Sequence, residues 1–238
     1  MASSAAPAGE LSLCFAHVGA RKAGDVERKA VNELVVRRTE RFECEQVYEG
    51  SDHARCFADM FGLELEPGAD RPEVLRAAVE DAMSVAVLFL GAYDQSKPAL
   101  FHGRGGAAAD AADDCGCVGW FGENLLQLLH EKRTGMSAGG AFHEWELRVS
   151  CVELFDECLS DLLAPENTEL RARLDPARGH VVVGAERRVL RSPADVREVV
   201  RRARANRTTL TLPMGGAAEP SCAIFELETA QREADDAA

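Results

Sequence analysis

The sequence predicts an α/β fold, in which a central sheet is flanked by helices. Segments with the alternating apolar pattern of strands are interspersed with segments whose apolar residues recur at helical spacing. The run from Val85 to Leu90 is apolar on both faces, as in a strand buried in the middle of a sheet. The length of 238 residues is enough for one sizeable domain or two small ones.

The first half of the chain is expected to supply short strands and one helix. Residues 1–10 are small and are expected to be disordered. Pro72 is expected to open a helix, because apolar residues follow it at helical spacing. The pattern predicts strands at 11–15, 34–36, 42–47 and 85–90, and loops at 21–29 and 103–116.

The second half is expected to alternate helices and strands. Ser192, Pro193 and Asp195 form a helix start, with a serine cap, a proline in the first turn and an acid near the positive helix end. The pattern predicts helices around 118–129 and 154–163, strands at 145–151, 180–183 and 222–227, and an acidic tail from 228 to 238.

Composition excludes several classes of function. The net charge of −13 argues against nucleic acid as a partner, and it disfavours other acidic polymers unless basic residues cluster on one face. The longest apolar stretch, Val85–Ala92, is far too short to cross a membrane, and the first ten residues do not read as a secretory signal. Eight cysteines without a CxxC pair are typical of a reduced, cytoplasmic protein.

Three segments resemble conserved motifs of the kinesin motor domain. Residues 149–163, VSCVELFDECLSDLL, are similar to the family pattern VSYxEIYNExxxDLL, and residues 206–227 are similar to NRxxxxTxMNxxSSRSHAIFxL. Residues 87–103 align with VFAYGQTGSGKTYTMEG, the phosphate-binding loop. Weaker similarities at 42–51 and 116–129 complete the family order.

The resemblance covers residues 11–227, which correspond to the first two-thirds of a motor domain. It implies a kinesin-like P-loop NTPase-type central sheet with flanking helices, incomplete at the C-terminus. The switch II motif DLAGSE and the microtubule-binding helices that follow it in the family are missing from the sequence. We therefore expect 11–227 to be a degenerate motor-like domain.

The resemblance also implies a degenerate nucleotide site. The frame GxxxxGK[ST] runs from Gly91 to Pro98, with Ser96 at the second glycine, Lys97 retained and Pro98 in place of the Mg²⁺ ligand. Asp94 adds negative charge where phosphate would lie. The switch I motif SSRSH aligns with 218–222, where only Ser221 agrees, and the adenine-side motif RxRP aligns with 16–19, where no residue agrees.

The candidate cofactor-binding residues are therefore Gly91, Ser96, Lys97, Pro98 and Ser221. We expect no catalytic residues and no resident cofactor, with ATP and Mg²⁺ bound only if this degenerate site still accepts them.

Three other groups of residues could in principle form functional sites. Glu153, Glu157 and Asp161 could serve as acids, but the resemblance places them at ordinary surface and helix positions of the family. His53, Cys56, Cys115 and Cys117 could bind zinc, but their spacing fits no standard site, so we expect no metal. Residues 187–207 carry eight arginines against two acids, which indicates either a solvated face or a contact to an acidic partner.

Three functions remain open from the sequence. The first is a non-hydrolysing, cytoskeletal binding or scaffold module whose partner is the microtubule or another cytoskeletal protein, not nucleic acid or membrane. Its contacts would be Arg197, Arg201, Arg202 and Arg204, or the hairpin at 171–180 that faces β-tubulin in the family. The second is an ATP-binding microtubule motor whose missing parts lie outside this chain. The third is an incomplete gene product that folds poorly.

The missing family strand would lie between 85–90 and 222–227. We therefore expect an incomplete sheet that a second polypeptide could complete, because exposed strand edges invite pairing.

Overall fold

The computed structural model describes residues 15–18, 26–30, 33–36, 40–43, 46–49, 56–58, 61, 74–80, 84–89, 96–103, 115–133, 143–176, 179–211, 217–218 and 220–233. The chain divides into two compact units, residues 1–60 and 61–238, and each is described by itself.

The first unit contains two small sheets. Strand β1 (Phe15–Val18) pairs in parallel with β5 (Gln46–Glu49), while β2 (Val26–Ala30), β3 (Glu33–Val36) and β4 (Glu40–Glu43) form an antiparallel sheet. The charged stretch at 21–29 is expected to be a loop or a surface insertion; from Val26 onward it is strand β2, so a loop there is wrong, while an insertion stays a prediction. Its charged residues are compatible with a strand because β2 lies at the edge of its sheet.

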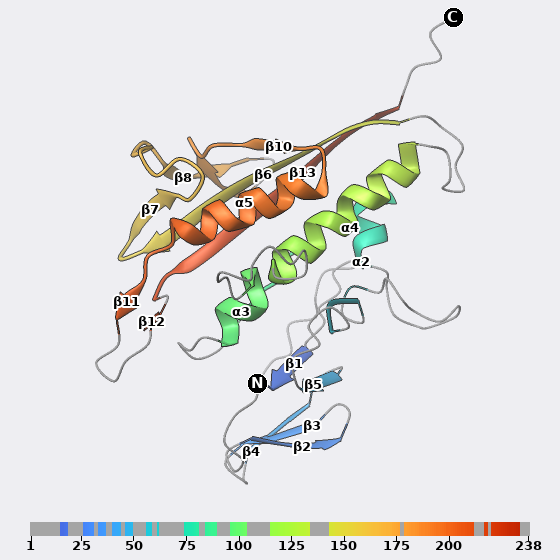
Figure 1. Cartoon of the computed structure of the whole chain (residues 1–238), viewed down its shortest axis with the longest axis vertical. Helices are drawn as coiled ribbons and strands as arrows, with labels where there is room; N and C mark the ends of the chain where they lie inside the picture. The colour runs from blue at the N-terminus through green and yellow to red at the C-terminus, as the bar shows by residue number, and fades with distance from the viewer. Residues whose placement is uncertain are drawn as a thin grey trace, which may run out of the picture. The chain divides into compact units, whose positions relative to one another are not determined.

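The second unit is built on a long antiparallel sheet (Figure 1). Its strands are β6 (His143–Phe155), β7 (Cys158–Asp161), β10 (Arg188–Leu190) and β13 (Cys222–Glu233). The order is β10-β6-β13, and β7 also pairs with β6. Two hairpins stand apart from this sheet: β8 (Arg171–Asp175) with β9 (Gly179–Val183), and β11 (Leu210–Thr211) with β12 (Ala217–Ala218).

Four helices of the second unit are described: α2 (Val74–Glu80), α3 (Ser96–His102), α4 (Gly116–Arg133) and α5 (Pro193–Ala205). α4 contacts α2, α3, α5 and β6, and α5 contacts β10. The apolar sides of α4, α5 and β6 form the core, whose buried members include Leu125, Leu129, Leu147, Val149, Cys151, Val196, Val199 and Val200. No helix within the described ranges is long and apolar enough to span a membrane.

The helix predicted at 154–163 is wrong. β6 continues to Phe155, and the chain turns back through Asp156 and Glu157 into β7. Both turn residues have positive φ, 48° and 63°, as a two-residue hairpin turn requires. The leucines in this segment are spaced as on a helix, but pairing of β7 along β6 overrides that local pattern.

The buried strand predicted at 85–90 is also wrong in its described part. Residues 84–89 carry no strand assignment, and Val85, Val87 and Leu88 are 36%, 43% and 74% exposed. An apolar run becomes a central strand only where neighbouring strands supply backbone partners. Among the strands that the structure describes, β13 pairs with β6 and not with this segment.

Strand β13 is longer than the predicted 222–227. It pairs with β6 as far as Glu233, so its last six residues lie within the segment expected to be an acidic tail. Glu228 lies opposite Arg148 in this register, and opposite charges at facing positions favour the pairing.

Candidate functional site

A buried ion pair joins Glu153 of β6 to Arg207, which follows the end of α5. The Arg207 Nε atom lies 2.8 Å from Glu153 Oε1, and the two side chains are 4% and 2% exposed. Charges withdrawn from water in this way require additional hydrogen bonds to be tolerated.

Thr208 and Ser221 supply those hydrogen bonds. The Thr208 backbone N–H and hydroxyl both donate to the Glu153 carboxylate, at 3.1 and 2.7 Å, and the Ser221 hydroxyl donates to Glu153 Oε1. Arg207 Nη2 donates to the Ser221 hydroxyl, at 2.9 Å, and to the Ser221 carbonyl, at 3.2 Å. Burial acts to raise the pKa of Glu153, but the hydrogen bonds from Ser221 and Thr208 and the Arg207 charge outweigh it, so this pKa lies below its ordinary value.

The end of α5 places Arg207 in this cluster. Asn206 caps the helix, and its side-chain amide donates to the Leu162 carbonyl at 2.8 Å. Arg207, the next residue, therefore reaches Glu153 of β6. The expectation that Glu153 occupies an ordinary surface or helix position is wrong. Leu147, Val149 and Cys151 alternate with more polar residues on β6, and continuing that alternation would have placed Glu153 on the buried face.

Asp161 and Glu157 do not join Glu153 in a catalytic arrangement. Asp161 is buried and accepts hydrogen bonds from the backbone N–H groups of Leu163, Ala164 and Glu186, at 2.8, 3.1 and 2.7 Å. It therefore organises the turn that follows β7. Glu157 is an exposed residue of the β6–β7 turn.

The predicted phosphate-loop residues lie on and before α3. Ser96 opens this helix, and Lys97 and Pro98 occupy its first turn, half-buried. A proline is accepted there because the first helical N–H groups have no partner within the helix. Gly91 lies outside the described residues.

The residues present do not fit a Mg²⁺ site of the phosphate-loop type. Pro98 carries no hydroxyl to ligate the ion. The Ser221 hydroxyl, the one switch I group that agrees with the family pattern, donates to the buried Glu153 carboxylate. The structure thus places Ser221 in the ion-pair cluster and Ser96, Lys97 and Pro98 in α3.

Helix α5 carries a basic face with a well-formed start. Ser192 Oγ accepts from the Asp195 N–H, which confirms the predicted serine cap. The Asp195 carboxylate also accepts from the N–H groups of Arg191 and Ser192. The Arg191 hydrogen bond is the largest contribution that holds the pKa of Asp195 below its ordinary value, against the opposing effect of burial.

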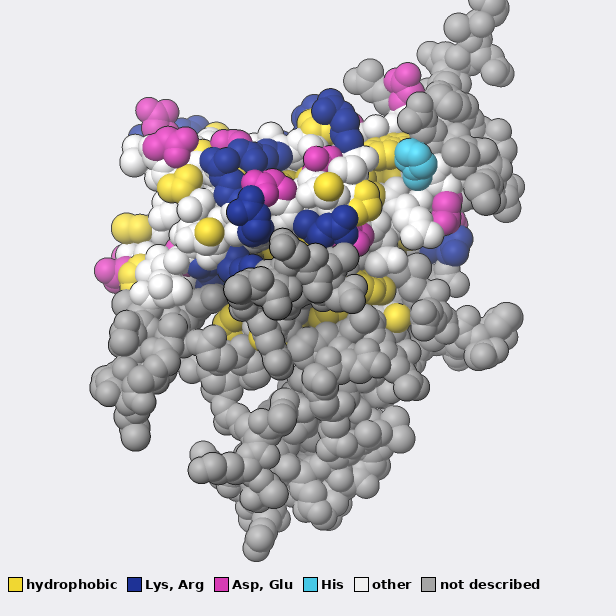
Figure 2. All heavy atoms as spheres, viewed as in Figure 1, with side chains coloured by type: hydrophobic (Ala, Val, Ile, Leu, Met, Phe, Trp, Pro, Cys, Tyr) yellow, Lys and Arg dark blue, Asp and Glu magenta, His cyan; other side chains and the backbone are white. Residues whose placement is uncertain are grey.

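Acidic neighbours partly neutralise the arginines of 187–207. Arg197 pairs with Glu123 of α4 at 2.9 Å, and Arg201 pairs with Glu198. Arg204 Nη1 donates to the His102 carbonyl at 3.3 Å, while Arg207 is withdrawn into the cluster with Glu153. Figure 2 shows Lys and Arg side chains gathered over α5 with Asp and Glu between them. Arg201 is the most open of these paired arginines.

The β8–β9 hairpin forms a second exposed surface. Arg171, Arg173 and Leu174 of β8 are exposed, Leu174 to 71%. This strand therefore presents two guanidinium groups and one apolar side chain to solvent.

Within the described part of the chain, no group of three or more His, Cys, Asp or Glu residues could hold a metal ion. Cys56 and Cys117 are buried and Cys115 is half-buried, while His53 lies outside the described residues.

Comparison with known families relates the sequence to motor proteins. The family described as Kinesin motor domain matches residues 102–238. Human chromosome-associated kinesin KIF4A is 27% identical over 199 residues, which cover 80% of this chain and 15% of that protein. Kinesin heavy chain of Neurospora crassa is 26% identical over 175 residues, covering 74% of this chain and 17% of the relative. The chain thus spans less than a fifth of the length of these relatives.

A solved structure of a fast kinesin has the same fold. It superposes with a TM-score of 0.64 at 20% identity and covers 92% of this chain, while the chain covers 59% of that structure. The mixed α/β architecture, a central sheet with helices, therefore matches that of a kinesin motor domain.

Proposed function

Since the chain belongs to the kinesin motor-domain family, we propose that it is a non-hydrolysing module that binds microtubules and acts as a scaffold in the cytoplasmic cytoskeleton. The published description of the solved fast kinesin refers to its ATPase mechanism and its interactions with microtubules. For this chain we propose interaction with microtubules and no ATPase activity.

One observation carries the non-hydrolysing part of the proposal. The Ser221 hydroxyl donates to the Glu153 carboxylate and accepts from the Arg207 guanidinium, so both charged groups of the buried pair use it as a partner. Releasing it toward a nucleotide would leave a buried carboxylate with fewer donors, which is unfavourable. With Pro98 in the first turn of α3, neither position offers the hydroxyl that Mg²⁺ needs.

The proposed microtubule binding depends on basic residues that are concentrated on particular surfaces, and not on the net charge of the chain. The chain as a whole is acidic, so attachment to an acidic polymer requires a concentrated basic surface. The exposed side of α5 and the β8–β9 hairpin provide such surfaces. The proposed contacts are Arg197, Arg201, Arg202 and Arg204 on α5, and Arg171 and Arg173 on β8.

Co-sedimentation with microtubules tests this proposal. Replacing both Arg201 and Arg202 with Glu should weaken binding about tenfold or more, and raising the salt concentration should weaken binding of the parent chain. Arg173→Glu tests the hairpin separately. Arg148→Glu is the matched control, because Arg148 is an exposed arginine on β6, outside both surfaces. If neither surface variant binds less than the control, the proposed contacts are wrong.

The second candidate function is an ATP-binding motor whose remaining parts lie outside this chain. It is favoured by Lys97, which keeps its family position and stands half-buried in the first turn of α3. Calorimetry with Mg-ATP separates the two functions, because the scaffold is expected to give no nucleotide heat and a motor should give binding that Lys97→Ala abolishes.

A further inference from the structure

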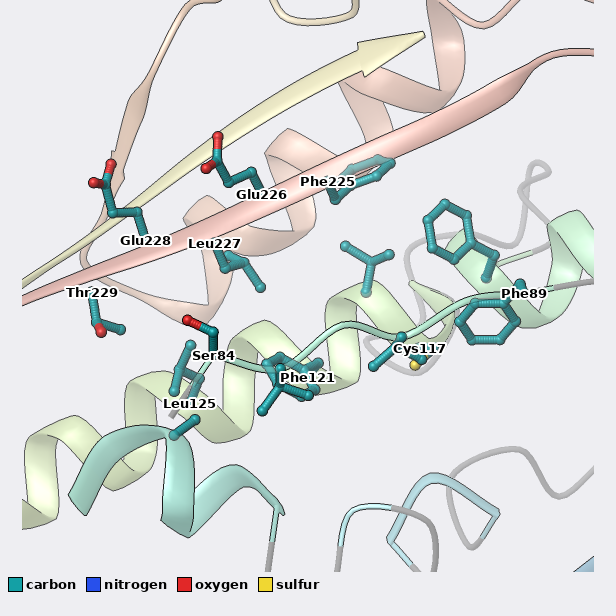
Figure 3. Close-up of a pocket in the computed structure, with 15 residues that line it drawn as sticks. Ser84, Phe89, Cys117, Phe121, Leu125, Phe225, Glu226, Leu227, Glu228 and Thr229 are labelled. Atoms are coloured by element: carbon teal, nitrogen blue, oxygen red, sulfur yellow. The ribbon is translucent and has the colours of Figure 1, made fainter. Parts of the chain in front are cut away.

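An apolar cavity and the arginine-rich helix α5 suit different ligands. The cavity, of about 490 Å³, lies between β13, the segment 84–89 and α4, and its lining is mainly apolar (Figure 3). The two acidic residues at its rim, Glu226 and Glu228, point away from α4 (Figure 3). Lys and Arg side chains gather instead over α5 (Figure 2). A negatively charged ligand would therefore bind along α5 and not in the cavity.

Three arginines of α5 lie on one face of the helix. Arg197, Arg201 and Arg204 are spaced at i, i+4 and i+7, a spacing that brings side chains together on a helix surface. We call these three residues the arginine row. The row spans about 10 Å along the helix axis, at about 1.5 Å per residue. This length suits a short chain that carries several negative charges more than it suits a single ion.

Two members of the row already have acidic partners. Arg197 Nη1 lies 2.9 Å from Oε1 of Glu123 on α4. Arg201 Nε lies 3.1 Å from Oε2 of Glu198, one turn earlier on α5. A carboxylate that arrives from another molecule can bind either arginine only by displacing, or by sharing with, a glutamate of the chain. These two positions therefore gain little when such a ligand binds.

Arg204 can form a new ion pair. Its Nη1 atom donates to the His102 carbonyl at 3.3 Å, and the side chain is half-buried. No acidic side chain in the described ranges pairs with it. A guanidinium group has five N–H donors, so a carboxylate can bind it without displacing the carbonyl. The ligand would gain a full ion pair at Arg204, whereas at Arg197 and Arg201 it would replace an existing one.

We propose that the arginine row binds an acidic peptide, with Arg204 as its anchor and with Glu123 and Glu198 as internal competitors that limit the affinity. Both internal partners are carboxylates, so the side chains of an acidic peptide can replace them with the same geometry. The net charge of −13 disfavours nucleic acid, which is more densely charged than a peptide. This inference rests on the proposed function, because it specifies the chemistry of the partner that α5 contacts.

Fluorescence anisotropy with a fluorescein-labelled peptide of ten glutamates tests the inference on the whole chain without microtubules. The parent chain should bind this peptide saturably, and binding should weaken as the salt concentration rises. A single-stranded DNA of ten thymidines is the comparison ligand and should bind more weakly than the peptide.

Glu198→Gln tests the internal competition. It frees Arg201 from its acidic partner and should strengthen peptide binding about two- to fivefold, the range expected for an exposed ion pair. Glu146→Gln is the matched control, because it removes the same charge and frees Arg148 on β6, outside the row. The control should leave peptide binding unchanged. Both pairs lie at the surface, so both variants should keep the fold, which circular dichroism checks.

Arg204→Gln tests the anchor and should weaken peptide binding about fivefold or more. Replacing Arg201 and Glu198 together with Gln removes one internal ion pair without changing the net charge, and it should change binding by about twofold or less. Arg148→Gln loses the same charge as Arg204→Gln at a site outside the row, and it should leave peptide binding unchanged.

Four outcomes would overturn the inference. Equal strengthening by Glu198→Gln and Glu146→Gln would mean that only the net charge matters. Binding by Arg204→Gln as strong as that by Arg148→Gln would remove the anchor. Equal affinity for the DNA and the peptide would mean a general polyanion surface. Absence of saturable peptide binding, in both the parent and Glu198→Gln, would mean that the row takes no acidic peptide.

The failure of this inference is distinguishable from that of the proposed function. If microtubules co-sediment with the chain through Arg201 and Arg202 but the glutamate peptide does not bind, the acidic-peptide inference alone is wrong. If the peptide binds as expected but microtubules do not, the arginine row stands and the microtubule is the wrong partner.

Discussion

At the scale of single residues, the Glu153–Arg207 pair joins parts of the chain that are far apart in sequence. Glu153 belongs to β6, Arg207 and Thr208 follow α5, and Ser221 precedes β13. A change at any member therefore loosens three elements together. Breaking a buried ion pair by removing one partner typically costs about 3–5 kcal/mol, because the other charge is left without compensation.

We predict that Glu153→Gln lowers the free energy of unfolding by about 3 kcal/mol at neutral pH. The pKa of Glu153 is lowered in the folded chain from an ordinary value of 4.5. A lowered carboxyl pKa stabilises the fold fully above the unfolded value, and this contribution is lost as the pH falls through the folded pKa. Urea unfolding of parent and variant should therefore differ most above about pH 5 and converge in more acidic solution.

Glu146→Gln is the control for this prediction. Glu146 pairs with Arg148 at 2.6 Å on the exposed side of β6, where an ion pair contributes about 1 kcal/mol or less. Equal destabilisation by the two substitutions, or a difference between Glu153→Gln and the parent that does not change with pH, would contradict the account of the buried cluster.

Among individual residues, the sequence predicted some roles well and others poorly. The Ser192 and Asp195 cap is confirmed because capping depends on neighbours in the chain. The partners of Glu153 lie 54 and 68 residues away, and a single sequence carries no signal for such distances. The nucleotide role of Gly91, Ser96, Lys97 and Pro98 stays a prediction.

At the scale of elements, the junction of α3 and α4 depends on a glycine. Gly116 has φ +59°, and a Cβ built on it would lie 2.5 Å from the Gly103 nitrogen and 2.6 Å from the Phe101 carbonyl carbon. These are backbone atoms, so no side-chain rotation could relieve the contact. The close approach allows α3 to lie against the start of α4.

We predict that Gly116→Ala destabilises the fold by more than about 3 kcal/mol, since backbone strain and overpacking add. Gly179, the first residue of β9, has a similar φ of +76° with no atom within 4 Å of the added Cβ. Gly179→Ala should therefore cost only the strain, about 1–2 kcal/mol. Thermal melts of the two variants would separate the effects, and equal melting temperatures would show that the close approach is unimportant.

The local sequence pattern predicted the helices and strands whose conformation does not depend on a distant segment of the chain. Helices α4 and α5 and the start of β6 are confirmed, because their amphipathic patterns agree with the faces they bury. The errors at 154–163 and 85–90 have one cause. Strand formation depends on a partner elsewhere in the chain, and local spacing shows neither the presence of β6 beside β7 nor the absence of a described strand beside 84–89.

At the scale of the whole molecule, the family was predictable from motifs although residue-level chemistry was not. The segments 149–163 and 206–227 identified the kinesin resemblance, and the family match over 102–238 and the shared fold confirm it. The same segments contain the buried cluster. The sequence therefore identifies the residues of the cluster as family positions. It does not predict their contacts, because these form only when β6, α5 and β13 come together in the fold.

The most direct test of the central claim is phosphate release by the purified chain in Mg-ATP, with and without microtubules. Pro98 has no hydroxyl where the family has Ser or Thr, and the Ser221 hydroxyl is bound to Glu153. We therefore predict a rate of phosphate release equal to the blank, because each lost electrostatic stabiliser costs orders of magnitude in rate. Lys97→Ala, the matched variant, should give the same blank value. Microtubule-stimulated phosphate release above the blank, abolished by Lys97→Ala, would contradict the non-hydrolysing account and establish the chain as part of a working motor.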